Sequence, residues 1–351
     1  MSDLLDAHDV LLADLDGTLY RGRGAVPGAV DAVTGAARRG TRTVYVTNNA
    51  SRRPVDVAGH LAELGFPATE QDVMTSSQAA AAMLAEQLPV GSPVLVVGTE
   101  ALAEEVIGVG LTVTTDPDGA VAVVQGHSPD TGWRALADAT VAVRAGAVWV
   151  ACNIDPTLPT ERGPLPGNGS MVAVVRTASG REPQVAGKPA PRLLRDALRR
   201  SGARSGLVVG DRLDTDIEGG NAVDLPTLLV FTGVSGPAEV LAAPPALRPT
   251  YLAADLAALT RPAAELAPAA RPGWQAQPGD DGTLVLSGDG AGSPEPALDA
   301  LRALAAVHWA GKGGEVRVQP DGPAAERAVN ELGLPTGADA GTGGSTTVAS
   351  A

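Results

Sequence analysis

Short apolar runs alternate along most of this chain with longer stretches rich in alanine, leucine and arginine. An apolar run at 10–15 is followed by a helical pattern at 29–40, a second apolar run at 42–47 and another helical pattern at 54–65. This alternation is typical of a parallel sheet whose two faces are covered by helices. It predicts an α/β protein with a doubly wound, Rossmann-like core.

The same alternation recurs twice before the composition changes. One further block begins near residue 79 and another near residue 186. Residues 261–272 are rich in proline and alanine, and we expect them to form a linker. Beyond this linker the pattern predicts a small α+β domain over 273–335. The last stretch, 336–351, has no apolar periodicity and is expected to be disordered.

The charge balance excludes several classes of partner. The chain has 26 basic and 40 acidic residues, a net charge of −14, whereas nucleic-acid-binding surfaces are basic. No apolar run approaches the ~20 residues of a membrane span, and the acidic start is unlike a signal peptide. The single cysteine, Cys152, excludes an internal disulfide, and no histidine or cysteine spacing suggests zinc. We therefore expect a cytoplasmic protein that binds neither nucleic acid nor membrane.

Two aspartates, Asp14 and Asp16, follow the first apolar run and precede a Gly-Thr turn. Ligands of open parallel sheets gather at the carboxyl ends of strands, and residues two apart on an extended chain share a face. A single aspartate here would be interpreted as a helix cap. Two close carboxylates, however, are costly unless a cation joins them or one stays protonated. The pair therefore predicts a ligand site at this strand end.

Two other segments carry groups suited to an anion. Thr47 and Asn48 end the second apolar run, where a hydroxyl and an amide suit the oxygens of an anion, although such a pair also occurs in ordinary turns. The chain has only two lysines, Lys188 and Lys312, and its other strongly basic residues are arginines. Since lysine delivers a point charge where arginine presents a planar fork, we interpret Lys188 as a requirement rather than a surface charge.

A third apolar run, at 206–210, ends in another acid, Asp211, and Asp216 follows five residues later. Two acids at this spacing can hold a divalent cation through direct and water-bridged oxygens, although helix-capping aspartates would give the same pattern. Carboxylates bind Mg²⁺, and lysine with threonine binds a phosphoryl group. One carboxylate is then left to attack phosphorus.

This ordered set of motifs resembles that of the haloacid dehalogenase-like phosphatases. The resemblance covers residues from about 8 to 260 and rests on Asp14-Leu15-Asp16-Gly17-Thr18, Thr47-Asn48, Lys188 and Gly210-Asp211 with Asp216. The long insert before Lys188 is similar to the large α/β cap of subclass IIA, which includes nucleotide, phosphoglycolate, pyridoxal-phosphate and 4-nitrophenyl-phosphate phosphatases. Within that subclass, the chain most resembles actinobacterial glycerol-3-phosphate phosphatases, which carry a short extra C-terminal domain.

The resemblance implies a division into domains. Residues 1–78 and 183–260 would form the phosphatase core, and 79–182 would form an inserted cap domain that selects the substrate. In related proteins the C-terminal unit has been likened to part of an acetyltransferase fold. Here it is too short for a whole domain of that kind, and 311–315 lacks the glycine pattern expected for a coenzyme A pyrophosphate. We interpret it as a docking or dimerisation module.

The resemblance also implies a role for each motif residue. Asp14 would be the nucleophile that forms an aspartyl-phosphate. Asp16 would protonate the leaving alkoxide and then activate water. Thr47 and Asn48 would hold the phosphoryl oxygens. Lys188 would balance the charge of Asp14 and of the phosphoryl group.

The implied cofactor is Mg²⁺. Asp14 and Asp211 would bind it through their carboxylates and Asp16 through its backbone carbonyl, while Asp216 would support the waters of the metal or Lys188. The resemblance thus implies a Mg²⁺-dependent phosphomonoester hydrolase that acts on glycerol 3-phosphate or a similar small phosphorylated metabolite. Phosphoglycolate, a nucleotide or 4-nitrophenyl phosphate are alternative substrates, and a catalytically silent binding or regulatory protein is the alternative from another class. The sequence leaves open whether the chain forms a homodimer.

The most distinctive part of the expected cap is the loop over 151–171. Asn153 and Asp155 are placed to face the core, and Arg162 or Asn168 is a candidate for contact with the leaving group. A purely structural loop explains the same residues. Closure of a cap over the site would exclude competing water before the phosphoryl group is transferred.

Overall fold

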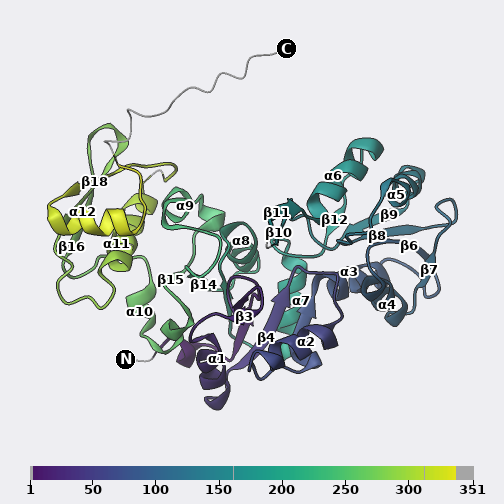
Figure 1. Cartoon of the computed structure of the whole chain (residues 1–351), viewed down its shortest axis with the longest axis horizontal. Helices are drawn as coiled ribbons and strands as arrows, with labels where there is room; N and C mark the ends of the chain where they lie inside the picture. Colours follow the sequence, from purple (N-terminus) through teal and green to yellow (C-terminus); the bar gives the residue numbers. More distant parts are fainter. Residues whose placement is uncertain (1–2, 161, 312, 337–351) are drawn as a thin grey trace, which may run out of the picture.

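The computed structural model describes residues 3–160, 162–311 and 313–336. Figure 1 shows three units side by side, with the middle one built on a six-stranded parallel sheet in the order β15-β14-β13-β1-β4-β5. The strands of this sheet are β1 (Val10–Ala13), β4 (Arg42–Thr47), β5 (Val73–Thr75), β13 (Gly206–Gly210), β14 (Thr227–Val230) and β15 (Tyr251–Ala253). All four residues of β1 are buried, as expected for a central strand covered on both sides.

Helices cover both faces of this sheet. The helical segments of the middle unit are η1 (Leu4–Ala7), α1 (Ala29–Arg38), α2 (Pro54–Glu63), η2 (Glu70–Asp72), α7 (Pro191–Ser201), η3 (Leu213–Ile217), α8 (Glu218–Asn221), α9 (Pro237–Ala242), η4 (Pro245–Leu247), η5 (Leu256–Thr260) and α10 (Ala263–Leu266). Leu11 packs in one cluster with residues of α1 and α2, whereas Leu12 packs in another with residues of α7. Because successive side chains of a strand point to opposite faces, these clusters lie on opposite sides of the sheet. The predicted doubly wound core is confirmed.

The second unit, the cap, is also α/β. Its five-stranded parallel sheet has the order β12-β9-β8-β6-β7. The strands are β6 (Pro93–Val97), β7 (Thr112–Thr114), β8 (Ala122–Gln125), β9 (Val148–Ala151) and β12 (Gln184–Val185), and the helices are α3 (Ser76–Ala85), α4 (Glu100–Gly108), α5 (Trp133–Ala145) and α6 (Asn168–Ser179). Two short hairpins complete the first two units: β2 (Tyr20–Arg21) with β3 (Gly24–Ala25), and β10 (Thr157–Thr160) with β11 (Gly163–Pro166).

The cap sheet extends beyond the boundary expected from the sequence. Strand β12 pairs with β9, so residues 184 and 185 belong to the cap sheet although the core was expected to resume at 183. The chain enters the cap at α3, which packs in one apolar cluster with α7 of the core and with the cap strands. A two-residue edge strand carries too little pattern to be seen in a sequence.

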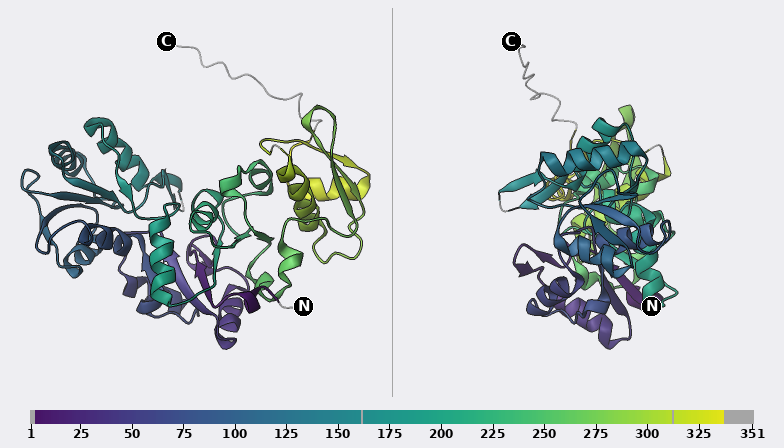
Figure 2. Two further views of the ribbon diagram at one scale, coloured as in Figure 1. Left: turned by 180° about the vertical axis from the view of Figure 1, so that it is seen from behind. Right: turned by 90° about the vertical axis from the view of Figure 1, so that its right-hand side faces the viewer.

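The C-terminal unit has a three-stranded mixed sheet in the order β16-β17-β18. It comprises β16 (Trp274–Pro278), η6 (Asp280–Gly282), β17 (Leu284–Gly288), α11 (Pro296–Ala310), β18 (Val318–Asp321) and α12 (Pro323–Glu331). Strand β17 is antiparallel to β16 and parallel to β18. The predicted small α+β unit is therefore present. Figure 2 shows from behind that this unit and the cap lie on opposite sides of the core.

The expected linker at 261–272 is partly folded against the core. Helix α10 lies within it, and Leu266 is fully buried in the apolar cluster that contains β1 and α1. Arg261 forms an ion pair with Glu295 at the start of α11. Proline and alanine suggested a loose connection, but one leucine supplies enough apolar surface to dock the segment. Of the tail expected to be disordered, all but Thr336 lies outside the described residues.

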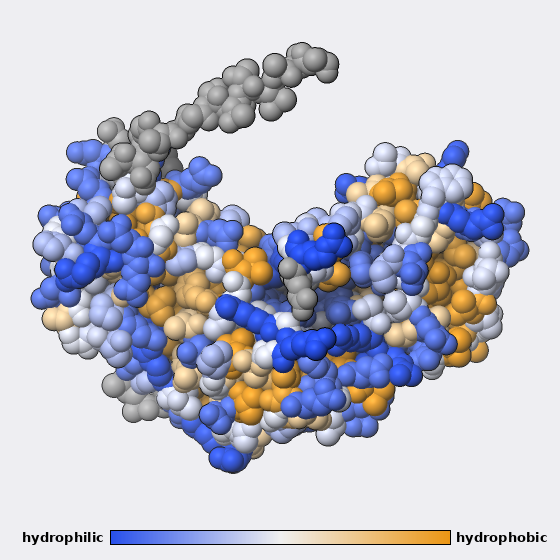
Figure 3. All heavy atoms as spheres, in the orientation of Figure 1, coloured by the Kyte–Doolittle hydropathy of each residue, from blue (hydrophilic) through white to orange (hydrophobic). Residues whose placement is uncertain are grey.

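The outer surface is mixed. The space-filling view shows a concave outline between the cap and the C-terminal unit, with hydrophilic residues in the middle of this face (Figure 3). Among the described residues, no helix combines the length and the apolar character needed to cross a membrane.

Candidate active site

The carboxyl ends of β13, β1 and β4 are neighbours in the core sheet. Asp14 directly follows β1, Asp211 directly follows β13, and Thr47 is the last residue of β4. Parallel pairing brings these three residues to one edge of the sheet, which is where open α/β sheets bind their ligands.

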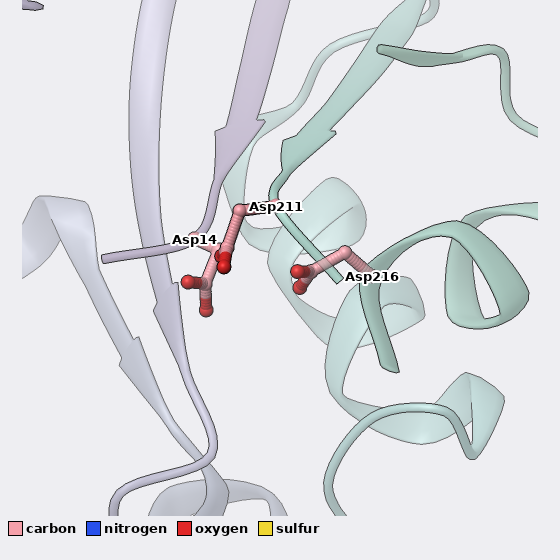
Figure 4. A group of neighbouring side chains, drawn as sticks. All are labelled: Asp14, Asp211 and Asp216. Carbon is pink, nitrogen blue, oxygen red and sulfur yellow. The ribbon is translucent and has the colours of Figure 1, made fainter. Parts of the chain in front are cut away.

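Asp14, Asp211 and Asp216 form a compact acidic group (Figure 4). One carboxylate oxygen of each lies within 4.8 Å of the others. Lys188 is only 2% exposed, and its Nζ donates to Oδ1 of Asp14 at 2.5 Å and to Oδ1 of Asp216 at 2.6 Å. Three carboxylates against one ammonium leave negative charge in excess. An all-oxygen donor set with this charge fits a hard divalent cation such as Mg²⁺.

Two glycines allow Asp211 to lie against neighbouring backbone. A Cβ at Gly17 would lie 2.5 Å from Oδ2 of Asp211, and a Cβ at Gly233 would lie 1.8 Å from the same atom. Gly17 also has a φ of +86°, a conformation that side chains disfavour. The Thr18 hydroxyl (3.2 Å) and the Val234 amide (2.8 Å) donate to the carboxylate. The Gly-Thr turn of the first motif therefore helps to fix the acid of the third.

Burial dominates the ionisation of this group. Desolvation raises the pKa of Asp14 well above its usual value, although the charge of Lys188 opposes the shift. Desolvation, with repulsion from Asp216, raises the pKa of Asp211 to about 6. Burial by itself would lower the pKa of Lys188, but the charges of Asp14 and Asp216 outweigh it and the pKa is raised. A divalent cation would relieve the repulsion between the acids.

Asp16 stands apart from the acidic group. Its carboxylate accepts a hydrogen bond from the Tyr20 hydroxyl at 3.4 Å and lines the same cleft as Asp14. Burial raises the pKa of Asp16. A carboxyl group that holds its proton more readily and lies two residues from Asp14 is suited to proton transfer. The side chain of Asp216, rather than that of Asp16, joins Asp14 and Asp211 in the acidic group.

Thr47 and Asn48 differ in whether their side chains keep a hydrogen-bond donor free for a ligand. Thr47 lines the cleft, and its hydroxyl oxygen accepts a hydrogen bond from the Asn49 amide at 3.0 Å. Its hydroxyl proton can therefore still donate to a ligand. The Asn48 side chain is engaged on every side, because it bonds both the backbone of Lys188 and the carboxylate of Asp155. The structure thus brings both residues to the cleft, but the N–H groups of the Asn48 amide already have acceptors and are not free for the expected phosphoryl contact.

A cleft of about 530 Å³ joins the acidic group to the cap. Its lining includes Asn153, Asp155 and Asn168 from the cap loop, as the sequence led us to expect, whereas Arg162 is exposed and does not line it. The Asn153 and Asn168 amides bond backbone carbonyls of residues 48, 125 and 153, which favours a structural role.

Two further residues of the cleft, Arg23 and Arg52, escaped the sequence analysis. Neither guanidinium has an ion pair among the residues that the structure describes. Arginines in loops carry no periodicity, and this chain has many, so only the fold could single them out.

Comparison with known proteins places the chain in a family. A model described as haloacid dehalogenase-like hydrolase matches residues 11–112, and a second model of that hydrolase type matches 185–259. A curated relative, D-glycerol 3-phosphate phosphatase from Mycobacterium tuberculosis, is 50% identical over 91% of each chain. The chain belongs to the haloacid dehalogenase-like hydrolases. The family resemblance found in the sequence is confirmed.

Solved structures of other haloacid dehalogenase-like hydrolases share the fold. A glycerol phosphate phosphatase from Mycobacterium tuberculosis in complex with magnesium has a TM-score of 0.90 and 49% identity, covering 95% of this chain and 99% of that one. A p-nitrophenyl phosphatase from Archaeoglobus fulgidus has a TM-score of 0.68 and 28% identity, covering 72% of this chain and 98% of its own. A GCN5-related N-acetyltransferase-like model matches residues 271–334, the C-terminal unit.

Proposed function

We propose that this protein is a Mg²⁺-dependent phosphomonoester hydrolase that acts on glycerol 3-phosphate or a similar small phosphate. The observation that carries the proposal is the buried ammonium of Lys188, held between Asp14 and Asp216 beside a third acid, Asp211. The relative with 50% identity, a D-glycerol 3-phosphate phosphatase, supports the choice of substrate.

In the proposed reaction Asp14 is the nucleophile. A carboxylate oxygen of Asp14 attacks phosphorus and forms an acyl phosphate, while the bond between phosphorus and the ester oxygen breaks. Asp16 gives its proton to the departing alkoxide. Asp16 then takes a proton from a water molecule, which attacks phosphorus and releases inorganic phosphate and the free Asp14 carboxylate.

Two side chains are proposed to bind the phosphoryl group. The hydroxyl of Thr47 donates to one of its equatorial oxygens, and the positive charge of Lys188 balances the negative charge that gathers on these oxygens in the transition state. The acids Asp14 and Asp211, with the backbone carbonyl of Asp16, would hold Mg²⁺, and Asp216 would keep Lys188 in place. When bound, Mg²⁺ would neutralise charge on both the nucleophile and the phosphoryl group.

The division of labour between the units is also a proposal. The cap would select the leaving group, since it supplies one wall of the cleft. The small phosphorylated substrate and the net charge of −14 favour a cytoplasmic enzyme of glycerophospholipid metabolism that binds neither nucleic acid nor membrane. The C-terminal unit, which packs on the core, would serve as a docking or dimerisation module.

The test is phosphate release from a panel of phosphomonoesters with Mg²⁺ and with a chelator. The panel contains glycerol 3-phosphate, phosphoglycolate, a nucleotide, a sugar phosphate and 4-nitrophenyl phosphate, because relatives include an acid sugar phosphatase from Staphylococcus saprophyticus and a 5'-nucleotidase from Bacillus subtilis. We expect Mg²⁺-dependent turnover with the highest kcat/KM for glycerol 3-phosphate. Lack of turnover on every substrate would instead favour a binding protein.

The nucleophile is tested by Asp14→Asn. An amide is a poor nucleophile and a weaker ligand for Mg²⁺, so we expect a folded protein without turnover. Beryllofluoride, which mimics an acyl phosphate, should inhibit the wild type. A variant that kept more than about a tenth of the rate, a loss of less than ~1.4 kcal/mol, would contradict covalent catalysis by Asp14.

A further inference from the structure

The Asn48 side chain joins the core to the cap at one point. Its Oδ1 accepts a hydrogen bond from the Lys188 amide at 2.8 Å, and its Nδ2 donates to the Lys188 carbonyl at 2.9 Å. The same Nδ2 donates to the carboxylate of Asp155 at 3.2 and 3.4 Å. One amide group therefore holds the backbone of the buried lysine on one side and an acid of the cap loop on the other.

The backbone of Asn48 is held as firmly as its side chain. Its carbonyl accepts hydrogen bonds from the Ser76 hydroxyl at 2.6 Å and from the Asn153 amide at 2.7 Å. Ser76 begins the helix through which the chain enters the cap. On the return path a Cβ at Gly187 would lie 2.5 Å from Oδ1 of Asn48. Asn48 thus lies where both crossings between core and cap meet.

These contacts leave the Asn48 side chain no N–H group for a substrate. An asparagine amide has two N–H donors. One is used by the Lys188 carbonyl and the other by Asp155. The carboxylate makes the second bond charge-assisted and hence stronger than one between neutral groups. Among the described residues no cation forms an ion pair with Asp155, although the charges of Arg212 and Lys188 act on it, and its carboxylate accepts its side-chain hydrogen bonds from the Asn48 amide.

We propose that Asn48 is a positioning residue for Lys188 and that Asp155, in the cap, holds the Asn48 side chain in the orientation this requires. The inference rests on the proposed function, since it concerns how the lysine of that site is placed. Asp155 orients the Asn48 amide, the amide fixes the backbone of Lys188, and the backbone fixes Nζ between Asp14 and Asp216. The position of the cap is thereby transmitted to the charge beside the nucleophile.

Under this proposal, substitutions of Asn48 and Asp155 change the rate differently from substitutions that remove a contact with the substrate. A misplacement of about 1 Å at a reacting centre can cost on the order of 100-fold in rate. We therefore expect Asn48→Ala and Asp155→Ala to lower kcat at least tenfold. Asp155→Asn keeps an oxygen that accepts from the Asn48 amide and should stay within about threefold of the wild type. Since Lys188 faces the phosphoryl group that all substrates share, the loss should be the same for glycerol 3-phosphate and 4-nitrophenyl phosphate.

A double-mutant cycle distinguishes action through Asn48 from an independent contact. If Asp155 acts through Asn48, the double variant should be no slower than Asn48→Ala alone. If Asp155 instead touches the leaving group, the two losses should multiply and depend on the substrate, which would overturn the proposal. Asp118→Ala, at an exposed acid of the cap, is the matched control and should leave the rate unchanged.

A second readout does not depend on activity. The chain has only two lysines, so a protein labelled with ¹³C at lysine Cε gives two side-chain NMR signals, and Lys312→Arg assigns them. We expect Asn48→Ala and Asp155→Ala to shift the Lys188 signal, Asp155→Asn to shift it less than Asp155→Ala does, and Asp118→Ala to leave it in place. An unmoved Lys188 signal in folded Asn48→Ala and Asp155→Ala would overturn the proposal. A wild type without turnover would overturn the proposed function, while the NMR experiment would still decide the positioning role.

Discussion

At the scale of single residues, Lys188 shows why one basic side chain cannot stand for another. Its Nζ lies within 2.6 Å of two carboxylate oxygens and donates to the Val46 carbonyl at 3.3 Å. The side chain is almost fully buried. Three acceptors converging on one buried atom match the three N–H groups of an ammonium. A planar guanidinium is larger and spreads its donors, so it does not fit this arrangement.

We predict that Lys188→Arg lowers kcat/KM at least tenfold with little change in melting temperature. The substitution keeps the positive charge, but the larger, planar guanidinium would clash with Asp14 or with ligands of the metal. Kinetics on glycerol 3-phosphate and thermal unfolding measure the two quantities. Lys312→Arg, the same exchange at the other lysine, serves as the control and should behave as the wild type. Near-wild-type activity in both variants would remove Lys188 from the site.

The titration of Asp211 allows a prediction of how Mg²⁺ and pH together affect the free energy of unfolding. In the metal-free protein, burial raises its pKa from 3.8 to about 6. Asp211 therefore binds more protons in the folded than in the unfolded state between these values, and its contribution to the free energy of unfolding falls as pH rises from about 4 to about 6. Mg²⁺ needs the ionised acid, so its stabilising effect should grow over the same interval.

Melting temperatures with Mg²⁺ and with a chelator, taken near pH 4.5 and near pH 7.5, check this prediction in the window set by linkage. We expect a larger difference at the higher pH. Asp211→Asn should lose most of the difference at both values because it removes both the titration and a ligand. An equal effect of Mg²⁺ at both pH values in the wild type would contradict this account.

At the scale of elements, the sequence predicted those parts of the site that depend on strand pattern. Asp14, Thr47 and Asp211 each end an apolar run, and parallel pairing of those runs is enough to bring them together. Two features could not be predicted this way. The partners of the Asn48 amide come from loops on either side of a crossing between domains. Helix α10 contains one buried leucine in a segment whose composition suggests a linker.

Two elements at the rim of the cleft add positive charge to an acidic protein. Arg23 lies in the turn between β2 and β3, and Arg52 lies in the loop that follows β4. Both line the cleft, and neither has an ion pair among the described residues. Free cations beside the mouth of a cleft raise the local concentration of an anionic substrate and speed its association.

We predict that Arg52→Gln lowers kcat/KM several-fold at low salt, with a smaller change in kcat. The difference from the wild type should shrink as ionic strength rises, because salt screens exposed charges. Arg53→Gln is a matched control. The guanidinium of Arg53, the next residue in the chain, pairs with Asp56 at 2.9 Å, and Arg53 does not line the cleft. A loss in kcat alone, unaffected by salt, would instead assign Arg52 to the chemical step.

At the scale of the whole molecule, the C-terminal unit continues the core. One apolar cluster contains Leu213 and Ile217 from η3, Leu252 from β15, and residues of α11 and β17. Segment η3 also carries Asp216, the acid that holds Lys188. The packing of the C-terminal unit therefore reaches the residues directly behind the acidic group. A docked unit, rather than an independent domain on a flexible linker, accounts for this arrangement.

Arg302 fastens the C-terminal unit to the core through polar contacts. It is fully buried on α11, and its guanidinium donates to the Leu252 carbonyl of β15 at 2.6 and 3.2 Å. The same group pairs with Asp299 at 2.7 Å and with Glu295 at 3.2 Å. Removing it would leave a strand carbonyl and a buried acid with fewer partners, and losing one member of a buried ion pair is strongly destabilising.

We predict that Arg302→Ala lowers the free energy of unfolding by about 3 kcal/mol and that core and C-terminal unit still unfold together. The shared cluster couples the two units, so calorimetry should show one transition at a lower temperature rather than early loss of a separate domain. Arg327→Ala, at an exposed arginine of α12, is the control and should change little. If the C-terminal unit melted first while turnover and the melting of the core stayed those of the wild type, the unit would be an independent appendage. Because η3 lies in that cluster, we expect turnover to be lost in this same transition, at the lower temperature at which Arg302→Ala unfolds.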